Sequence, residues 1–307
     1  MVYDLIIIGS GPAGLSAAVY GMRAGLKLLV LEQNVMSGGQ VLNTYEVDNY
    51  LGLPGINGFD LGMKFKEHAQ KMGAEFVQTV VKAIRQKDAL KIVETADGCL
   101  YEAKALILAA GAEHSLLHVP GEQEYKGKGV SYCATCDGAF FKGREVAVVG
   151  GGDVAVEDAV YLSRLCSRVH LIHRRDSLRA AKSLQEKLFA CDNVEVHWNQ
   201  TVSEICGNDL VESVKLHSVE NGADSRLEVE GVFVAIGMQP NTDAFRELLA
   251  CDASGYIQAG EDCAASEPGI FAAGDIRTKQ IRQIVTAVAD GACAVAGVEH
   301  YLTQNGL

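Results

Sequence analysis

Two cysteines near the middle of the chain, Cys133 and Cys136, are separated by two residues and followed directly by Asp137. A Cys-x-x-Cys pair can close a small reversible disulfide, and its reduction leaves a thiolate that can attack another disulfide. A structural zinc site would need two further ligands, but the sequence has no second Cys-x-x-Cys and no neighbouring histidines at ligand spacing. The other cysteines are scattered among apolar or small neighbours, so we expect reduced thiols there. The pair is predicted to perform redox chemistry, with no metal.

A glycine-rich loop near the N-terminus predicts a dinucleotide site. The apolar run 4–8 is typical of a strand buried on both faces, 15–24 indicates a helix, and 28–31 indicates a second strand. Such a loop allows a tight turn and close approach of the backbone to a pyrophosphate, which then meets the helix N-terminus. Glu32, 23 positions after the first glycine, is placed to accept a hydrogen bond from a ribose hydroxyl. The G-x-G-x-x-G motif itself consists of Gly9, Ser10, Gly11, Pro12, Ala13 and Gly14.

The same unit recurs later in the chain with opposite charge at the matched position. Strand 145–149 leads into the loop Gly150, Gly151, Gly152, Asp153, Val154 and Ala155, with a helix expected at 156–165 and a strand at 169–172. His173 stands 23 positions after Gly150, where the first copy has its acid, and is followed by Arg174, Arg175 and Arg179. Guanidinium groups bind phosphate through paired, charge-assisted hydrogen bonds, so this site is predicted to prefer NADPH over NADH. The alternative is a solvated basic segment beside a loop.

The repeat also predicts the domain organisation. With 307 residues the chain is about twice as long as a typical single domain. Further buried strands are expected at 105–110, 232–236 and 269–273. The predicted fold class is α/β, with two Rossmann-like nucleotide-binding domains that have mainly parallel central sheets, the second inserted into the first. We expect the first domain at 1–114 and 241–307, and the inserted domain at 115–240.

Charge and hydropathy exclude some classes of partner. The formal net charge of −12 argues against nucleic-acid binding, which requires a basic surface. The N-terminal apolar run meets Gly9 after a few residues, which is too short for a signal peptide. No stretch approaches the roughly 18 residues of a membrane span. We therefore expect a cytoplasmic protein with no membrane or nucleic-acid partner.

Taken in order, these motifs resemble those of the low-molecular-weight bacterial thioredoxin reductases over essentially the whole chain. The resemblance rests on the two glycine loops, on Cys133-Ala134-Thr135-Cys136-Asp137, on His173-Arg174-Arg175 with Arg179, and on Ala273-Gly274-Asp275. It implies a homodimer that transfers electrons from NADPH through FAD to the dithiol and then to thioredoxin. Cys136 would face the flavin, Cys133 would attack the thioredoxin disulfide, and Asp137 would protonate the departing thiol.

The resemblance also implies two sets of cofactor-binding residues. FAD would contact the first glycine loop, Glu32, Gln33, Gly39, Gln40, Asn49, Gly274, Asp275, Arg282, Gln283 and Ile284. NADPH would contact Gly151, Gly152, Asp153, Val154, His173, Arg174, Arg175, Arg179, Ile236 and Gly237. One departure is Val154, where the family usually has Ser or Thr, so a hydroxyl contact to the NADPH phosphate is missing and weaker binding is expected.

Alternative functions remain open within the same architecture. Some relatives take electrons from ferredoxin and lack the basic cluster that this chain has. Others reduce a peroxiredoxin through an additional N-terminal domain, or oxidise small dithiols with oxygen and need no NADPH site. From a different class, the chain could be a flavin-binding redox sensor whose dithiol reports redox state without turnover.

Overall fold

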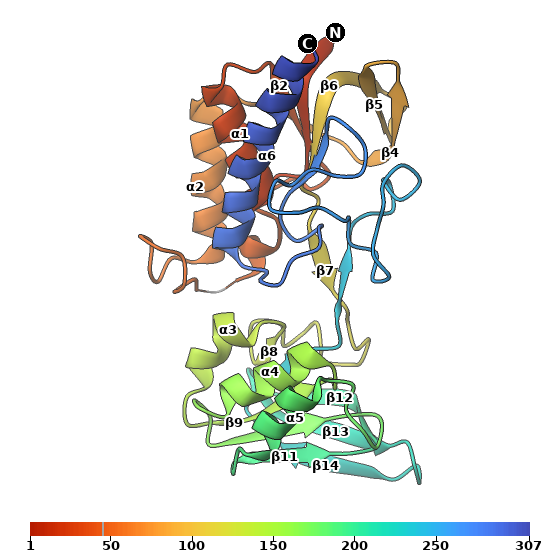
Figure 1. Cartoon of the computed structure of the whole chain (residues 1–307). Helices are drawn as coiled ribbons and strands as arrows, with labels where there is room; N and C mark the ends of the chain where they lie inside the picture. Colours follow the sequence, from red (N-terminus) through yellow and green to blue (C-terminus); the bar gives the residue numbers. More distant parts are fainter. Residues whose placement is uncertain (45) are drawn as a thin grey trace. The chain divides into compact units, whose positions relative to one another are not determined.

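The computed structural model describes residues 1–44 and 46–307. The chain forms two compact units, which are coloured by sequence in Figure 1. Unit 1 combines Met1–Glu113 with Gln239–Leu307, and unit 2 is the intervening segment His114–Met238. Each unit is built around its own mainly parallel sheet, as the repeated strand–loop–helix pattern predicts.

Unit 1 is organised around a seven-stranded sheet in the order β3-β2-β1-β6-β5-β4, with β17 paired to β6. The parallel part carries the apolar strands, and Ile6 of β1 lies between Leu29 of β2 and Leu106 of β6. The strands β4 and β5 continue the sheet in antiparallel pairing. Their bounds are β1 Val2–Ile8, β2 Leu28–Glu32, β3 Glu75–Gln78, β4 Val81–Lys87, β5 Leu90–Thr95, β6 Leu100–Leu108 and β17 Ile270–Ala272.

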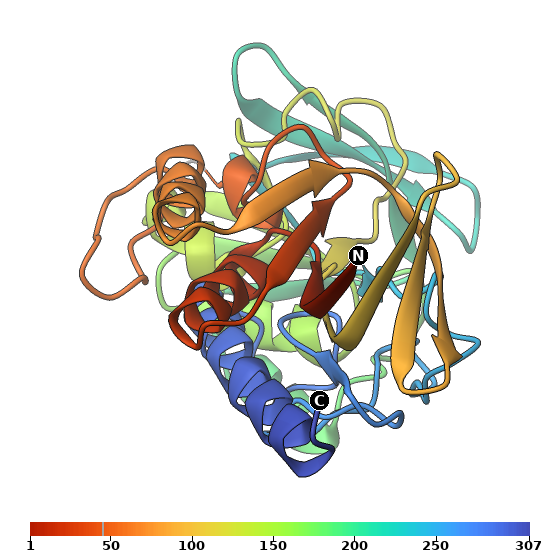
Figure 2. The same cartoon turned by 90° about the horizontal axis from the view of Figure 1, so that it is seen from above.

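Three helices cover one face of this sheet: α1 (Pro12–Arg23), α2 (Gly58–Lys71) and α6 (Ile284–Gln304). Figure 1 and Figure 2 both show α6 lying along α1. The two helices approach closely at Gly291, where an added Cβ would lie 2.2 Å from the carbonyl oxygen of Ala13. A short 3-10 helix, η1 (Gly39–Asn43), precedes α2. The long C-terminal helix is therefore held directly against the helix that follows the first glycine loop.

Unit 2 has a five-stranded parallel sheet in the order β11-β10-β9-β15-β8. One face packs on α4 (Asp153–Leu162) and α5 (Lys182–Phe189), and the other on a three-stranded antiparallel sheet. The parallel strands are β8 Val130–Ser131, β9 Glu145–Val149, β10 Arg168–Ile172, β11 Val194–His197 and β15 Gly231–Val234. The antiparallel strands are β12 Gln200–Gly207, β13 Val211–Ser218 and β14 Asp224–Glu228. Between β8 and β9 lie the short helices α3 (Ala134–Asp137) and η2 (Gly138–Phe141).

The chain passes between the units through two short strands, β7 (Ala112–His114) and β16 (Met238–Pro240), which pair as a two-stranded sheet. The backbone N–H of Ser115 donates to the carbonyl of Gly237 at 2.9 Å, and that of Asn241 donates to Gly111 at 3.0 Å. The outgoing and returning segments are therefore hydrogen-bonded neighbours.

The predicted fold class is confirmed, and the helix bounds need correction. The expected helices 15–24 and 156–165 begin three residues earlier, at Pro12 and Asp153, because Gly11 and Gly152 act as their N-cap residues. The helical pattern of residues 281–296 also predicts a helix, which runs instead from Ile284 to Gln304. Within the described ranges, none of the helices combines the length and apolar character that crossing a bilayer requires.

Candidate functional site

The first glycine loop joins β1 to α1 and is shaped by two close backbone approaches. Gly9 has a φ of +102°, and a Cβ there would lie 2.4 Å from the carbonyl oxygen of Ala109. A Cβ on Gly14 would lie 1.9 Å from the carbonyl oxygen of Gly9. No described side chain caps α1, so its first N–H groups are available to an anion at the end of β1. This geometry suits a pyrophosphate.

Glu32 ends β2 beside this loop and is almost fully buried. One oxygen accepts from the backbone N–H and the hydroxyl of Ser10 at 2.8 and 2.6 Å, and the other accepts from the N–H of Asn34 at 2.8 Å. A carboxylate has about four lone-pair positions, so one further donor can still be bound. Gln33 is exposed next to it. A hollow of about 330 Å³ adjoins this strand end and is lined by Asn34, Val35, Met36, Gly39 and Leu42.

The segment carrying Gly39 and Gln40 is fastened to the same loop. The N–H of Gly38 donates to the carbonyl of Ser10 at 2.8 Å, and a Cβ on Gly39 would lie 3.2 Å from the Cα of Gly11. The side-chain amide of Gln40 donates to the carbonyl of Ala112. Residues nearly thirty positions apart thus form one surface around the loop.

The last part of unit 1 brings the other predicted flavin contacts together. The side-chain amide of Asn49 donates to Gln283 at 2.9 Å, just before α6 begins at Ile284. Oδ1 of Asp275 and Nε of Arg282 are buried and have no hydrogen-bond partner among the described residues. Burial raises the pKa of Asp275, against the opposing effect of Lys279 and Arg282. Because buried polar groups are rarely left unpaired, one free acceptor and one free donor here fit a polar ligand such as a flavin nucleotide.

Gly274 connects this region to the first loop, because a Cβ there would lie 2.9 Å from the Cβ of Ala13. Its N–H donates to Asp290 of α6 at 2.8 Å. Asp290 also accepts from Nε and Nη2 of Arg277 at 2.9 and 2.7 Å and from Lys279 at 2.8 Å. All three charged side chains are at least nine-tenths buried. Sequence reasoning did not identify this buried ion cluster, which fixes the backbone before Asp275.

The second glycine loop, in unit 2, has a similar shape around a histidine ring. A Cβ on Gly150 would lie 2.4 Å from the carbonyl oxygen of Ala235, and one on Gly151 would lie 2.2 Å from the ring of His173. The carbonyl of Gly151 accepts from the N–H of Arg179 at 2.7 Å. As in unit 1, no described side chain caps the helix that follows, and its first turn is open to an anion.

The basic cluster divides into exposed and buried members. His173 is 5% exposed, its Nε2 lies 3.0 Å from the carbonyl oxygen of Ser177, and burial lowers its pKa. Arg174, Arg175 and Arg179 are exposed. The histidine is therefore neutral near pH 7 and supports the loop from beneath, while the arginines carry the positive charge.

The remaining predicted nucleotide contacts differ in what their side chains do. Oδ1 of Asp153 accepts from the N–H of Ala181 at 2.8 Å, so this side chain joins α4 to the segment before α5. Val154 is exposed in the first turn of α4. Ile236 is partly exposed after β15, and Gly237 has a φ of +121°. These residues follow the carboxyl ends of the parallel strands, where open α/β sheets bind ligands.

The dithiol lies between β8 and β9 of the same unit, at the start of α3. Cys133 and Cys136 form a disulfide and are both half-buried. The hydroxyl of Ser131 accepts from the N–H of Cys133 at 3.1 Å and donates to Oδ2 of Asp137 at 2.5 Å. Burial raises the pKa of Asp137, and the Ser131 hydrogen bond opposes that rise. A carboxyl group that retains a proton more readily thus stands one residue from a redox-active sulfur. Ser131 was missed by sequence reasoning, since nothing in its spacing marks it.

The chain is similar to known proteins over nearly its whole length. The profile of a family described as pyridine nucleotide-disulphide oxidoreductase matches residues 3–291. The thioredoxin reductase of Bacillus subtilis is 48% identical over 99% of this chain and 96% of its own length, and that of Listeria innocua is 48% identical over 99% and 95%. A crystal structure of thioredoxin reductase from Streptococcus pyogenes superposes with a TM-score of 0.93 at 46% identity, covering 99% of both chains.

Proposed function

The chain belongs to the pyridine nucleotide-disulphide oxidoreductase family and acts as a thioredoxin reductase, and we propose that its electrons come from NADPH and pass through FAD to the Cys133–Cys136 disulfide. The observation that carries this proposal is the disulfide itself, which lies next to Asp137, a carboxyl group whose pKa is raised. The same unit also has the glycine loop that is flanked by arginines. A flavin and a pyridine nucleotide are what the family implies. FAD and NADPH are the specific choices that the residues favour.

The FAD proposal rests on unit 1. The first glycine loop and the open start of α1 would bind the pyrophosphate, and the spare lone pair of Glu32 would accept from the adenosine ribose. The unpaired Oδ1 of Asp275 and Nε of Arg282 would bind polar atoms of the flavin half, near Asn49 and Gln283. When bound, FAD accepts a hydride from a reduced nicotinamide and supplies an electron pair to a disulfide.

The NADPH proposal rests on unit 2. Its glycine loop would bind the pyrophosphate, and the exposed guanidinium groups of Arg174, Arg175 and Arg179 would bind the 2′-phosphate. The neutral His173 would position the loop rather than neutralise charge. These three arginines disfavour a ferredoxin-dependent enzyme, which would not need them.

The chain's own sulfur atoms perform the thiol–disulfide exchange with thioredoxin. After reduction, Sγ of Cys133 attacks one sulfur of the thioredoxin disulfide, which breaks that S–S bond, forms a mixed disulfide and releases the other thioredoxin sulfur as a thiolate that takes up a proton. Sγ of Cys136 then attacks Sγ of Cys133, which restores the enzyme disulfide and expels the thioredoxin thiolate. Asp137 gives that thiolate a proton, and its raised pKa favours the protonated carboxyl that this role requires. The thioredoxin disulfide gains two electrons and the enzyme dithiol loses two.

We further propose a cytoplasmic homodimer, as the resemblance to the bacterial enzymes implies. Light scattering on the eluting protein would then give about twice the chain mass of 32.7 kDa. A mass of one chain would contradict the dimer without touching the redox proposal.

The proposal is tested by following flavin colour under anaerobic conditions. The purified protein should be yellow, should bleach on mixing with NADPH, and should recolour when oxidised thioredoxin is added. Bleaching by reduced ferredoxin but not by NADPH would overturn the NADPH assignment. Bleaching by NADPH without recolouring by any oxidised thioredoxin would support the redox-sensor alternative.

Variants assign the individual roles. Cys133→Ser should still be bleached by NADPH but should not reduce thioredoxin, while Cys191→Ser, which changes a thiol outside the pair in the same unit, should behave as wild type. Normal turnover by Cys133→Ser would refute the assignment of the attacking sulfur.

Arg175→Gln should raise the KM for NADPH and leave the KM for NADH unchanged. Arg226→Gln, which alters an exposed arginine of unit 2, is the matched control.

A further inference from the structure

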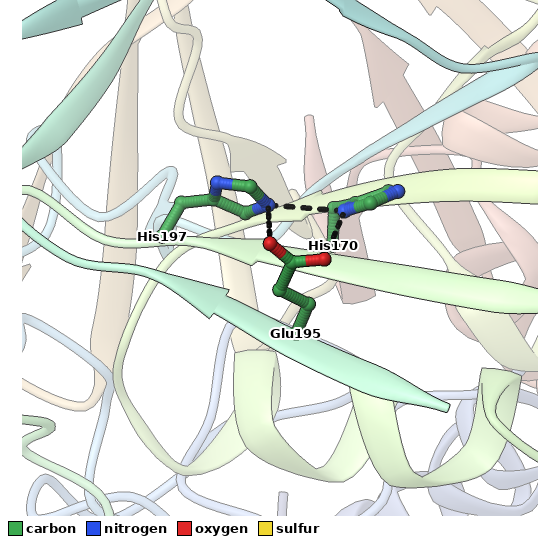
Figure 3. A group of neighbouring side chains, drawn as sticks. All are labelled: His170, Glu195 and His197. Atoms are coloured by element: carbon green, nitrogen blue, oxygen red, sulfur yellow. Dashed lines mark hydrogen bonds and ion pairs between the residues drawn. The ribbon is translucent and has the colours of Figure 1, made fainter. Parts of the chain in front are cut away.

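A second cluster of chemistry-bearing side chains lies on the parallel sheet of unit 2, on β10 and the edge strand β11. Figure 3 shows the rings of His170 and His197 turned toward one another with the carboxylate of Glu195 between them. The sheet register places His170 directly opposite Glu195, and His197 follows Glu195 by two residues. Since side chains alternate between the faces of a strand, all three point to the same face. None of them belongs to the proposed redox machinery.

The three donor atoms lie at distances that one metal ion can bridge. Nδ1 of His170 is 3.0 Å from Nε2 of His197 and 3.9 Å from Oε2 of Glu195, and Nε2 of His197 is 3.8 Å from Oε1 of the same carboxylate. One ligand atom can be chosen from each residue so that all three lie within 4.8 Å of one another. Tetrahedral zinc with ligands at about 2.0–2.2 Å keeps its ligand atoms about 3.3–3.5 Å apart. The observed separations lie on both sides of that value. To reach it, the two imidazole nitrogens must move apart by a few tenths of an ångström, and the Glu195 carboxylate, which is about half exposed, must move closer by a similar amount.

The surroundings of His170 complete a pattern typical of metal sites. Its side chain is 3% exposed, so the ring cannot swing away into solvent. Its other nitrogen, Nε2, lies 3.4 Å from Oε2 of Glu145 on β9. If Nε2 carries the proton and donates to Glu145, Nδ1 has its lone pair directed at His197 and Glu195. A carboxylate that orients a ligating histidine in this way is a common feature of zinc sites.

We propose that His170, His197 and Glu195 form a binding site for a divalent transition-metal ion, zinc above all, with water as the fourth ligand. Two imidazoles and one carboxylate are a donor set that zinc accepts, and its lack of redox chemistry makes it compatible with a protein that transfers electrons elsewhere. The sequence predicted no metal because His170 and His197 are 27 positions apart, and only strand pairing brings them together.

One neighbouring charge opposes the ion. Nη1 of Arg168 lies 3.7 Å from Oε2 of Glu195 and competes with a cation for that carboxylate. Arg168→Gln should therefore tighten metal binding several-fold, whereas Glu145→Gln should weaken it about tenfold because the orienting carboxylate is lost.

The proposal is tested on the intact flavin-loaded protein with the disulfide closed and accessible thiols alkylated, so that cysteine cannot supply the ligands. Equilibrium dialysis against buffered Zn²⁺, followed by metal analysis, should give one zinc per chain. X-ray absorption at the zinc edge should show nitrogen and oxygen ligands without sulfur. His197→Gln, at a half-buried and therefore tolerant position, should weaken binding at least tenfold.

The matched control is His217→Gln on β13 of the same unit. His217 also contacts a carboxylate, with its Nδ1 2.7 Å from Asp224, but it belongs to no group of three potential metal ligands among the described residues. This variant should bind zinc as wild type does. Three results would each overturn the proposal. They are an equal zinc affinity of wild type and His197→Gln, sulfur among the atoms that coordinate the metal, and no zinc uptake at micromolar free zinc.

Discussion

The buried ion cluster around Asp290 leads to a sharp prediction about unit 1. Four hydrogen bonds of 2.7–2.9 Å end on the two carboxylate oxygens, from Gly274, from Arg277 twice and from Lys279. The side chains of Arg277 and Lys279 are only 6% and 7% exposed, so water cannot replace the carboxylate. Asp290→Asn keeps the volume, creates no cavity, and takes from Arg277 and Lys279 the carboxylate that both of them contact.

The expected cost follows from that arrangement. Removing one partner of a buried ion pair typically destabilises a protein by about 3–5 kcal/mol, because the remaining charge stays desolvated. The matched control is Glu299→Gln on the exposed face of the same helix, which should change stability by less than about 0.5 kcal/mol. At a urea dependence of about 1–3 kcal/mol per molar, the Asp290 variant should unfold at least about 1 M earlier.

Two optical signals separate the units in this assay. Far-UV circular dichroism reports on both, whereas fluorescence of Trp198, the single tryptophan, reports on unit 2. Asp290→Asn should shift the circular dichroism transition, together with flavin release because Gly274 loses its anchor. A shift no larger than that of Glu299→Gln would refute the view that Asp290 neutralises the buried cations.

The pH dependence has a definite sign. Burial alone would raise the pKa of Asp290, but hydrogen bonds from Arg277, Lys279 and Gly274 outweigh it and hold the pKa below the usual 3.8. A carboxyl group whose pKa is lower in the folded state stabilises the fold above its unfolded pKa and loses that effect as pH falls through the folded value. The difference between wild type and Asp290→Asn should therefore be constant near neutral pH and shrink below 3.8.

Three further predictions concern the proposed cofactor and redox residues. Ser131→Ala removes a hydrogen bond that favours the Asp137 carboxylate, so the pKa of Asp137 should rise further. The alkaline limb of the pH profile of kcat/KM for thioredoxin should then move to higher pH. A limb that does not move would contradict the proton-donor role of Asp137. Gly151→Ala places a Cβ 2.2 Å from the imidazole beneath the loop and should raise the KM for NADPH about tenfold or more, a loss of about 1.4 kcal/mol, with flavin content unchanged. Arg226→Gln, the exposed control in the same unit, should leave that KM nearly unchanged, and equal effects of the two variants would count against the loop geometry. Asp275→Ala removes a buried unpaired oxygen, so the free energy of unfolding of the flavin-free protein should rise by about 1–3 kcal/mol, as measured by thermal or urea unfolding. The affinity for flavin, measured by fluorescence, should fall. An unchanged flavin affinity would rule out the proposed contact.

The two glycine loops were predictable from sequence because their chemistry is local. A buried strand, a G-x-G-x-x-G or G-x-G-x-x-A turn and a following helix are adjacent in the chain, and Gly9 and Gly150 mark where β1 and β9 end. The same locality explains why the fold class could be inferred. Helix starts were placed too late because a glycine within the motif is also the N-cap of the helix.

Features that depend on packing were not predictable. The matched spacing placed His173 with the arginines, but only the fold shows its ring beneath Gly151, buried and neutral. The Asp290 cluster joins residues of a loop and a helix 11 to 16 positions apart, with no periodicity to reveal it. His170 and His197 meet only because two strands pair in a particular register.

The paired strands β7 and β16 have a consequence for how such a protein can be altered. Because the chain leaves and returns through neighbouring strands, unit 2 is attached at one place and its two ends meet there. The host sheet does not depend on the segment between them, since β6 before the insertion and β17 after it are themselves paired. A module with adjoining ends can be exchanged between related proteins as one cassette, by recombination or by design. The dithiol and its arginine-flanked loop would travel together in that exchange, and the flavin unit would keep its strand order.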